Sequence, residues 1–219
     1  MTPLLFVPGC REDSGPFVAD WLQAQLPRAC TLELLDPTRP VLAEWAASLR
    51  AAVLRQAQPV RLVAQGFGAL AGVVVAADRP DRVAELILVA PAHPGRFDFL
   101  GAKPASGGAA RDLDLVLSQQ ALRVRGHLLA AGDDTLLSSA QAAALATVWG
   151  LQLHTLAPGQ GALEAAGLLR RLLAQAAAAT PLAPSGGRRG RGSCLAAVRH
   201  YTRWQSEKPR SSRHRIQQR

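Results

Sequence analysis

Short runs of Val, Leu and Ile alternate along this chain with longer stretches in which apolar residues recur at helical spacing. Runs of this length suit strands that are buried on both faces of a sheet, and the stretches between them are long enough for helices that connect parallel strands. The alternation therefore predicts an α/β fold, a compact three-layer sandwich of about six parallel strands with helices on both faces of the sheet. The predicted strands are Leu4–Val7, Cys30–Leu35, Val60–Ala64, Glu85–Ala90, Val124–Ala131 and Leu151–Leu156, and the predicted helices span residues 16–26, 41–57, 68–78, 138–149 and 161–179.

The 219 residues and their hydrophobic content of 48% are enough for one domain of ordinary size with a tail. The β-α rhythm stops at Pro181, where a stretch rich in Pro, Gly and Arg begins. We therefore predict an α/β domain over residues 1–180 and a basic, disordered tail over residues 181–219. Inside the domain, residues 93–120 form a Gly/Pro-rich insertion that we interpret as an irregular loop, with a lid at the carboxyl ends of the strands as the alternative.

The formal net charge of +9 is unevenly distributed. Of the 25 basic and 16 acidic residues, the segment from residue 185 onward holds 10 and 1, which leaves 15 of each in residues 1–184. This tail also contains His200, Tyr201 and Trp204, which together with its arginines would suit phosphate contacts and base stacking. We favour a solvated extension over a nucleic-acid-binding element, because Arg-rich segments without periodic apolar residues generally do not fold alone.

The three cysteines, Cys10, Cys30 and Cys194, are too few for a disulfide framework, and no Cys/His spacing suggests a metal site. The N-terminus lacks the basic start of a signal peptide, and charged residues interrupt the apolar segment 162–179. The sequence thus predicts a soluble, cytoplasmic protein with no metal and no cofactor.

The segment Leu62–Leu70 reads Leu-Val-Ala-Gln-Gly-Phe-Gly-Ala-Leu; it follows a predicted buried strand and opens an apolar helix. A strand-turn-helix with the pattern small-x-Ser-x-Gly presents the nucleophile in enzymes that attack carbonyl groups with a serine. Here Ala64 and Gly68 occupy the small flanking positions, and Gly66 occupies the position of the serine. Glycine has no side chain with which to attack a carbonyl.

At this segment the chain resembles the α/β-hydrolase-fold serine hydrolase family typified by retinoblastoma-binding protein nine and its bacterial relatives, over roughly residues 3–175. Val18 and Ala19 stand where these relatives often carry a His-Trp pair. The motifs that carry the resemblance are Val7-Pro8-Gly9, Asp13-Ser14-Gly15-Pro16, the turn that commonly reads Ala-His-Ser-Phe-Gly in relatives, and the strand end Gly132-Asp133-Asp134. Relatives also carry a late Gly-His before the final helix, and this chain has Gly159-Gln160 there.

The resemblance implies a catalytic triad whose nucleophile position is Gly66, whose acid is Asp134, with Asp133 as the near alternative, and whose histidine position is Gln160. Only the acid is retained. Glutamine is neutral near pH 7 and cannot accept the proton of a serine. The resemblance therefore implies an esterase-like serine hydrolase with an incomplete triad, that is, a pseudoenzyme.

An oxyanion hole can survive such losses, because its donors are backbone N–H groups. The predicted donors are the N–H of Phe67 and one N–H of the Gly9–Cys10 turn.

Two side chains could substitute for the missing ones: Cys10 as nucleophile, and His93, which follows the fourth predicted strand, as base. Each has a simpler interpretation, since a buried cysteine usually acts as a small hydrophobe and a loop histidine usually serves as a hydrogen-bonding partner. His154 alternates with Leu151 and Leu153 and is interpreted as a strand residue without a catalytic role.

Three functional hypotheses follow. The one we favour is an inactive hydrolase-fold protein that retains a pocket for a small acyl or ester ligand or for a protein partner. The first alternative is an active carboxylic-ester hydrolase that uses Cys10 or His93. The second is nucleic-acid binding through the tail. No membrane partner is expected.

Overall fold

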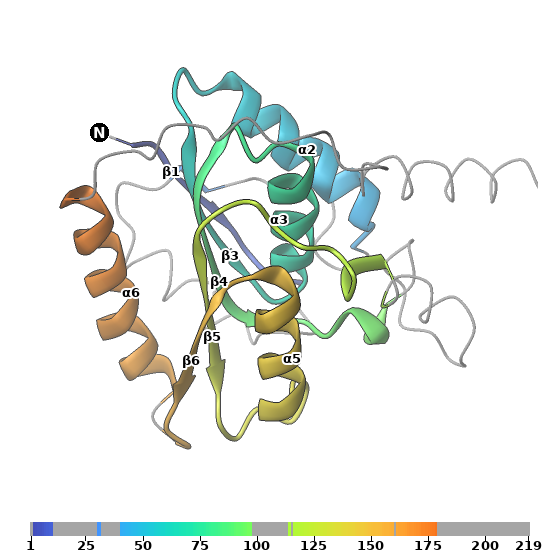
Figure 1. The fold of residues 1–219 in the computed structure, drawn as a ribbon, viewed down its shortest axis with the longest axis vertical. Helices are drawn as coiled ribbons and strands as arrows, with labels where there is room; N and C mark the ends of the chain where they lie inside the picture. Colours follow the sequence, from blue (N-terminus) through green and yellow to red (C-terminus); the bar gives the residue numbers. More distant parts are fainter. Residues whose placement is uncertain are drawn as a thin grey trace, which may run out of the picture.

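A parallel sheet of six strands forms the centre of the computed structural model, which describes residues 2–10, 30–31, 40–97, 114, 116–159 and 161–178 (Figure 1). The strands lie in the order β2-β1-β3-β4-β5-β6, and each neighbouring pair is parallel. The chain moves from β1 to one side and then returns to the other, so the order reverses between β1 and β3. The strands are β1 (Leu4–Val7), β2 (Cys30–Thr31), β3 (Val60–Gln65), β4 (Val83–Pro91), β5 (Gly126–Ala131) and β6 (Gln152–Leu156).

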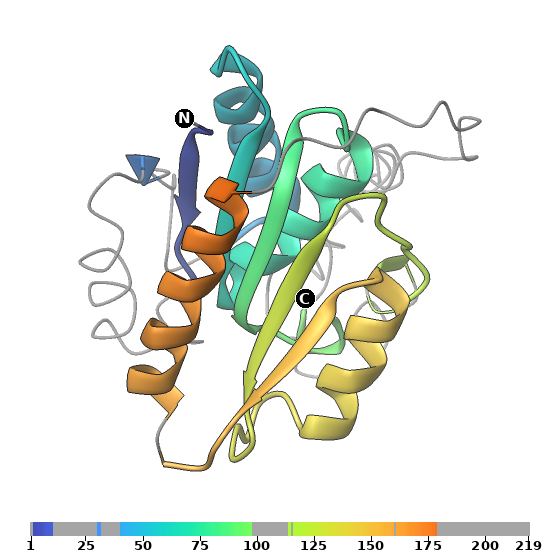
Figure 2. The ribbon, with the colours of Figure 1, turned by 60° about the vertical axis from the view of Figure 1, so that its left-hand side comes forward.

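Described helices cover both faces of the sheet (Figures 1 and 2). Helix α6 packs on one face, and α2, α3 and α5 pack on the other. The helices are α2 (Leu42–Arg55), α3 (Gly66–Asp78), α5 (Ser139–Trp149) and α6 (Gly161–Ala178), with a short 3-10 helix η1 (Pro94–Arg96) after β4.

The predicted α/β fold with helices on both faces is confirmed. The ends of some elements differ from prediction. Helix α3 begins at Gly66, two residues before the predicted start, because the chain turns directly from strand into helix. Strand β5 begins at Gly126, although Val124 is already buried, so the apolar character of Val124 reflects packing before strand pairing starts.

Several predicted segments lie outside the described residues. These are the helix at 16–26, residues 32–35 of the second strand, most of the insertion at 93–120, residue 179 of the last helix, and the tail at 181–219. The division into a domain and a tail near residue 180 therefore stays a prediction.

Alternation along each strand sends side chains into two hydrophobic cores. Odd-numbered residues of β3 and β4, such as Val63 and Ile87, pack with Leu169 and Leu172 of α6. The even-numbered residues of the same strands pack against α2, α3 and α5, whose buried members include Trp45, Leu70 and Trp149. Helix α3 is buried from Gly66 to Ala76, which explains why its sequence is apolar all round.

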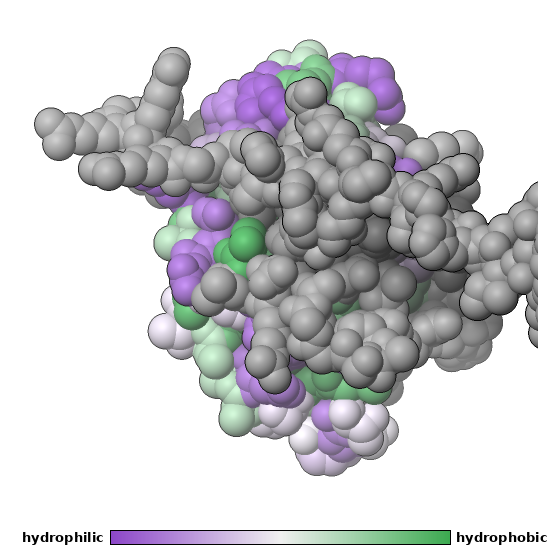
Figure 3. Space-filling view, turned by 90° about the vertical axis from the view of Figure 1, so that its right-hand side faces the viewer, coloured by the Kyte–Doolittle hydropathy of each residue, from purple (hydrophilic) through white to green (hydrophobic). Residues whose placement is uncertain are grey.

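The surface of the described residues shows little exposed apolar area. Among them, the large hydrophobic side chains that are exposed are Leu54 and Leu136. Among the coloured residues in Figure 3, hydrophobic and hydrophilic ones are interspersed. No helix in the described part of the chain is both long and apolar enough to span a bilayer.

Candidate active site

The turn between β3 and α3, where the sequence predicts the nucleophile position, passes directly from strand into helix, and we call this turn the elbow. Gly66, at its vertex, has a φ of 52°, in the left-handed region that side-chain-bearing residues rarely adopt. Its carbonyl oxygen accepts a hydrogen bond of 3.0 Å from the N–H of Ala92, and Gly66 forms a parallel bridge with Pro91. The end of β4 thus fixes the vertex in place.

Backbone strain lies beside this vertex rather than on it. Ala90 has a φ of 43°, and it is the one non-glycine residue with positive φ among those the structure describes. Such a conformation costs about 1–3 kcal/mol for a non-glycine residue. The strain sits in β4, next to the Pro91 that bridges Gly66.

The turn after β1 packs tightly against the start of α3. A Cβ atom added to Gly68 would overlap the carbonyl oxygen of Pro8 and would lie 2.9 Å from Cγ1 of Val7. Only glycine therefore allows this approach, which brings the predicted donor turn of Gly9 and Cys10 to the elbow. The site lies where the strand order reverses, the position at which open α/β sheets bind ligands.

Phe67, whose N–H is the second predicted oxyanion donor, is held by aromatic packing. Its ring makes edge contacts with Trp45, at a centroid distance of 5.1 Å, and with Phe97, at 4.8 Å. All three side chains are buried, and such pairs contribute about 0.5–1.5 kcal/mol each beyond their buried area. The aromatic contacts thereby pack Phe67 into the core at the start of α3.

Gln65, just before the vertex, was missed by the sequence interpretation. Its side chain is buried, and its Oε1 has no hydrogen-bond partner. A buried polar atom without a partner costs about 1–3 kcal/mol. No pattern in the sequence marks this atom, because Gln65 continues the strand in an ordinary way.

The two candidate acids follow β5, as predicted, and their carboxylates have different partners. Oδ1 of Asp134 accepts hydrogen bonds from the N–H groups of Leu136, at 2.7 Å, and Leu137, at 3.1 Å. Oδ2 of Asp133 accepts one from the N–H of Gly159, at 2.9 Å. Asp134 therefore stabilises its own turn, whereas Asp133 holds the loop that leads to position 160.

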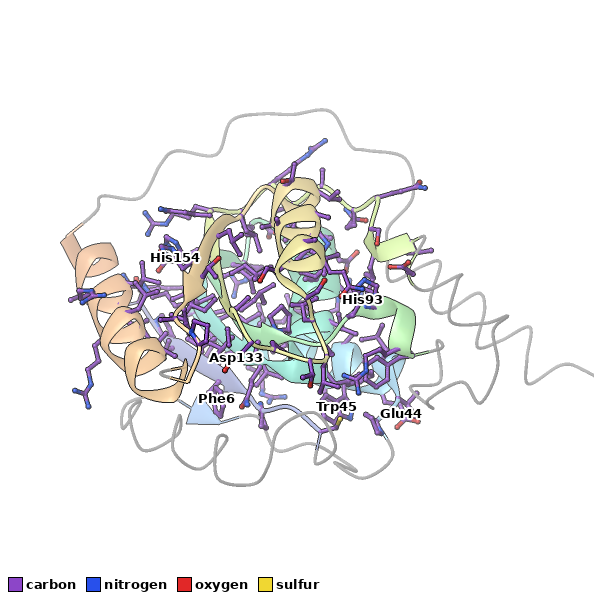
Figure 4. All side chains as sticks on the ribbon, turned by 90° about the horizontal axis from the view of Figure 1, so that it is seen from below. Phe6, Glu44, Trp45, His93, Asp133 and His154 are labelled. Atoms are coloured by element: carbon purple, nitrogen blue, oxygen red, sulfur yellow. The ribbon has the colours of Figure 1, made fainter. Side chains whose placement is uncertain are left out.

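His93 lies at the predicted carboxyl edge, and its hydrogen bond argues against a role as base. Its Nδ1 accepts the N–H of Gly95 at 3.1 Å, so the proton of the neutral ring is assigned to Nε2. Nε2 then has no lone pair for a substrate proton. Figure 4, which looks onto this edge of the sheet, also shows His93 well apart from Asp133.

The remaining candidates are Cys10, Gln160 and any group of metal ligands. Cys10 is buried, with 3% of its surface exposed, which fits the simpler interpretation of a packing residue. Gln160, the predicted histidine position, lies outside the described residues. Within the described ranges, no three His, Cys, Asp or Glu side chains gather as they would around a metal ion.

Comparison with known proteins agrees with this geometry. A model of the serine hydrolase family matches residues 4–169, which include the elbow and both acids. This chain belongs to the serine hydrolase family, and its fold is that of the α/β hydrolases. No curated protein matches the chain.

Solved structures give the same class. A protein described as a YdeN-like hydrolase from Pectobacterium atrosepticum is 25% identical, with a TM-score of 0.61 over 78% of this chain and 89% of that one. The ydeN gene product of B. subtilis is 16% identical, with a TM-score of 0.57 over 82% and 100%. Est1E from Butyrivibrio proteoclasticus, solved with ferulic acid bound, is 14% identical, with a TM-score of 0.62 over 81% and 90%. The last two show likeness of fold alone.

Proposed function

We propose that this protein binds a small carboxylic acid or ester at the elbow and does not hydrolyse it by the serine mechanism of its family. The observation that carries the proposal is Gly66 at the vertex, with its φ of 52°. A left-handed residue at this strand-to-helix turn supports the assignment of Gly66 to the nucleophile position, and glycine has no side chain with which to attack a carbonyl.

The missing base supports the same proposal. Serine attack needs an adjacent group that accepts the hydroxyl proton. The residue at the histidine position is Gln160, and the Nδ1 of His93 is occupied by the N–H of Gly95. Both the nucleophile and the base would have to be restored before the usual acyl-enzyme could form, because triad members act as a unit.

Ligand binding depends on groups that remain. An oxyanion hole is built from backbone N–H groups, here those of Phe67 and of the Gly9–Cys10 turn, and neither requires a particular side chain. The packing of Gly68 against Pro8 brings this turn to the elbow. A carboxylate or an ester carbonyl is the ligand that such donors recognise.

The test is hydrolysis of p-nitrophenyl acetate and butyrate by the wild type and by the double variant Gly66→Ser with Gln160→His. We expect no turnover above buffer from the wild type and measurable turnover from the double variant. The single variants are the matched controls, and each should stay near the wild-type rate. Thermal unfolding of each variant checks that the fold is retained.

Binding is measured separately, by the shift of the melting temperature and by NMR line broadening with butyrate as probe. We expect saturable binding by the wild type that competes with p-nitrophenyl butyrate. Wild-type turnover at a rate comparable to that of the double variant would contradict the proposal, and so would a lack of butyrate binding.

The alternative, an active ester hydrolase with Cys10 as nucleophile, predicts the opposite result in the hydrolysis assay. Cys10 follows β1 in the turn beside the elbow, so its thiol is in the right part of the fold. If the alternative holds, the wild type is active and Cys10→Ala abolishes turnover. Nucleic-acid binding through the tail is separated from both by truncation after residue 180, which would remove any steeply salt-dependent binding.

A further inference from the structure

Five charged or ionisable side chains gather on the α6 face of the sheet, in the amino halves of its strands. We call them the Glu85 cluster. They come from four neighbouring strands or from the residue just before a strand. Their side chains lie on the same face of the sheet as those of Val63, Ile87 and Leu129. The members are Arg61 of β3, Glu85 of β4, Arg125 and His127 at the start of β5, and His154 of β6.

Glu85 is the buried anion of this cluster, with 4% of its side chain exposed. Its Oε2 lies 3.3 Å from Nε of Arg61, and its Oε1 lies 3.8 Å from Nε of Arg125 and 3.8 Å from Nε2 of His127. Oε2 has no hydrogen bond of good geometry. The carboxylate is therefore held by charge more than by direct hydrogen bonds.

The two histidines form a hydrogen-bonded pair. Nδ1 of His127 lies 3.0 Å from Nε2 of His154, and the ring centroids are 5.1 Å apart. One N–H between two ring nitrogens satisfies this contact, so both rings can be neutral. Two protonated rings would instead place two N–H groups, and two positive charges, against each other.

Arg61 connects the cluster to α6. Its NH1 nitrogen donates a hydrogen bond of 2.7 Å to the carbonyl oxygen of Leu173, in the last part of the helix. Arg170 and Arg171, the charged residues of α6 whose burial is described, are exposed. In Figure 4, His154 lies on the side of the sheet that α6 covers. Arg61 thus connects the cluster on the sheet to this helix.

We propose that the Glu85 cluster is an acid-sensitive clasp, which holds α6 on the sheet while the His127–His154 pair is neutral and loosens it when the pair takes up protons. A charged His127 would compete with Arg61 for Glu85, and a second charge on His154 would break the contact between the rings. Arg61 would then hold α6 with less support from its counterion.

The two histidines determine the direction in which folding stability changes with pH. Burial, then His154 and Arg125, lower the pKa of His127 below its ordinary value, and burial lowers the pKa of His154. Glu85 favours the protonated form of His127 from 3.8 Å, but these causes outweigh it. The unfolded chain takes up protons near its ordinary histidine pKa of about 6.5 while the fold resists them, so stability falls as the pH drops through that value.

Glu85 acts in the opposite direction at lower pH. Burial raises its pKa, against the lowering effects of Arg125 and Arg61. The folded carboxylate therefore takes up a proton before the unfolded one, which adds stability as the pH falls toward the ordinary glutamate range of about 4.3. Between about pH 7 and pH 5.5 the histidines are therefore expected to dominate.

Loosening of α6 would also affect the loop at the carboxyl edge of the sheet, where the candidate site lies. The helix begins at Gly161, immediately after position 160, and the preceding Gly159 is held by Asp133. A change in the packing of α6 therefore alters the support of this loop. The clasp does not depend on whether the site binds or hydrolyses its ligand.

The first experiment is urea unfolding of the full chain between about pH 7.5 and pH 5.5, for the wild type and for the double variant His127→Gln with His154→Gln. The folding equilibrium constant of the wild type should fall below pH 6.5 by up to about tenfold per pH unit for each histidine. The double variant should lose this slope, whatever its stability at pH 7.5. His93→Gln, which removes a histidine outside the cluster, is the matched control for the substitution itself.

The second experiment uses the wild type alone, so it does not depend on how a variant folds. Hydrogen exchange of α6 is compared with that of α5 in the same molecule, which corrects for the intrinsic effect of pH. Protection of α6 should fall relative to α5 between about pH 7 and pH 5.5. Equal slopes in the wild type and the double variant, or equal loss of protection in the two helices, would overturn the proposal.

Discussion

At the carboxyl end of β3 the chain has an unusual backbone, with a glycine of positive φ at the turn, whereas the amino halves of β3 to β6 gather ionisable side chains on a regular backbone. At the turn between β3 and α3, Gly66 has positive φ and Gly68 packs closely against Pro8, and neither residue has a side chain. In the Glu85 cluster, the strands are ordinary and the charges are unusual. Backbone geometry and side-chain chemistry are thus separate properties of one sheet, and each can be tested by substitution.

The largest effect is expected from Arg61→Met, which keeps most of the apolar stem and removes the charge. Glu85 would then be buried without its nearest counterion, and Leu173 would lose its hydrogen-bond donor. We expect a loss of about 3–5 kcal/mol in the free energy of unfolding, measured in urea at pH 7.5. Adding Glu85→Gln should recover a large part of the loss, because it removes the unpaired buried charge.

The matched control is Arg79→Met. Arg79 forms an ion pair of 2.8 Å with Asp81, whose side chain is 61% exposed. Exposed pairs contribute less than about 1 kcal/mol. If both substitutions cost the same, burial does not distinguish the Glu85 cluster from the surface.

Gly68→Ala tests the close backbone packing at the turn between β3 and α3. The added methyl group meets the Pro8 carbonyl, which cannot rotate away as a flexible side chain would. We expect a loss of about 3 kcal/mol, at the upper end of the range for overpacking. Gly167→Ala in α6, where an added Cβ meets nothing within 4 Å, is the control and should gain up to about 1 kcal/mol.

The smallest of these effects concerns the vertex. Gly66→Ala forces a residue with a side chain into a φ of 52° and should cost about 1–2 kcal/mol. Gly66→Asn should cost less, because asparagine tolerates the left-handed region. Thermal unfolding of both variants measures the difference. Equal costs would mean that steric contact, and not the backbone angle, determines which residue fits here.

Much of this fold could be predicted from the sequence because its signals are local. The buried strand at Val60 and the apolar helix after it were visible as runs of residues, and the expected elbow lies between them. Order along the chain also placed Asp133, Asp134 and His93 after their strands, at the common carboxyl edge of a parallel sheet.

Contacts between residues that are far apart in the sequence could not be predicted from such local patterns. His127 and His154 are 27 residues apart, and only the pairing of β5 with β6 brings their rings together. The sequence interpretation treated His154 as a strand residue, which it is, but gave it no partner. Likewise, nothing in the order of Asp133 and Asp134 indicates that the first reaches Gly159 while the second bonds within its own turn.

The sequence by itself determined the class of fold and that position 66 has no side chain, because hydrophobic periodicity and residue identity are properties of the chain alone. The tertiary structure decided the positive φ of Gly66 and the close packing of Gly68 against Pro8. It also decided the contacts that bring Arg61, Glu85 and the two histidines together. The physical reason is that these features depend on strand order and register, which join residues far apart in sequence through packing and hydrogen bonding across the sheet.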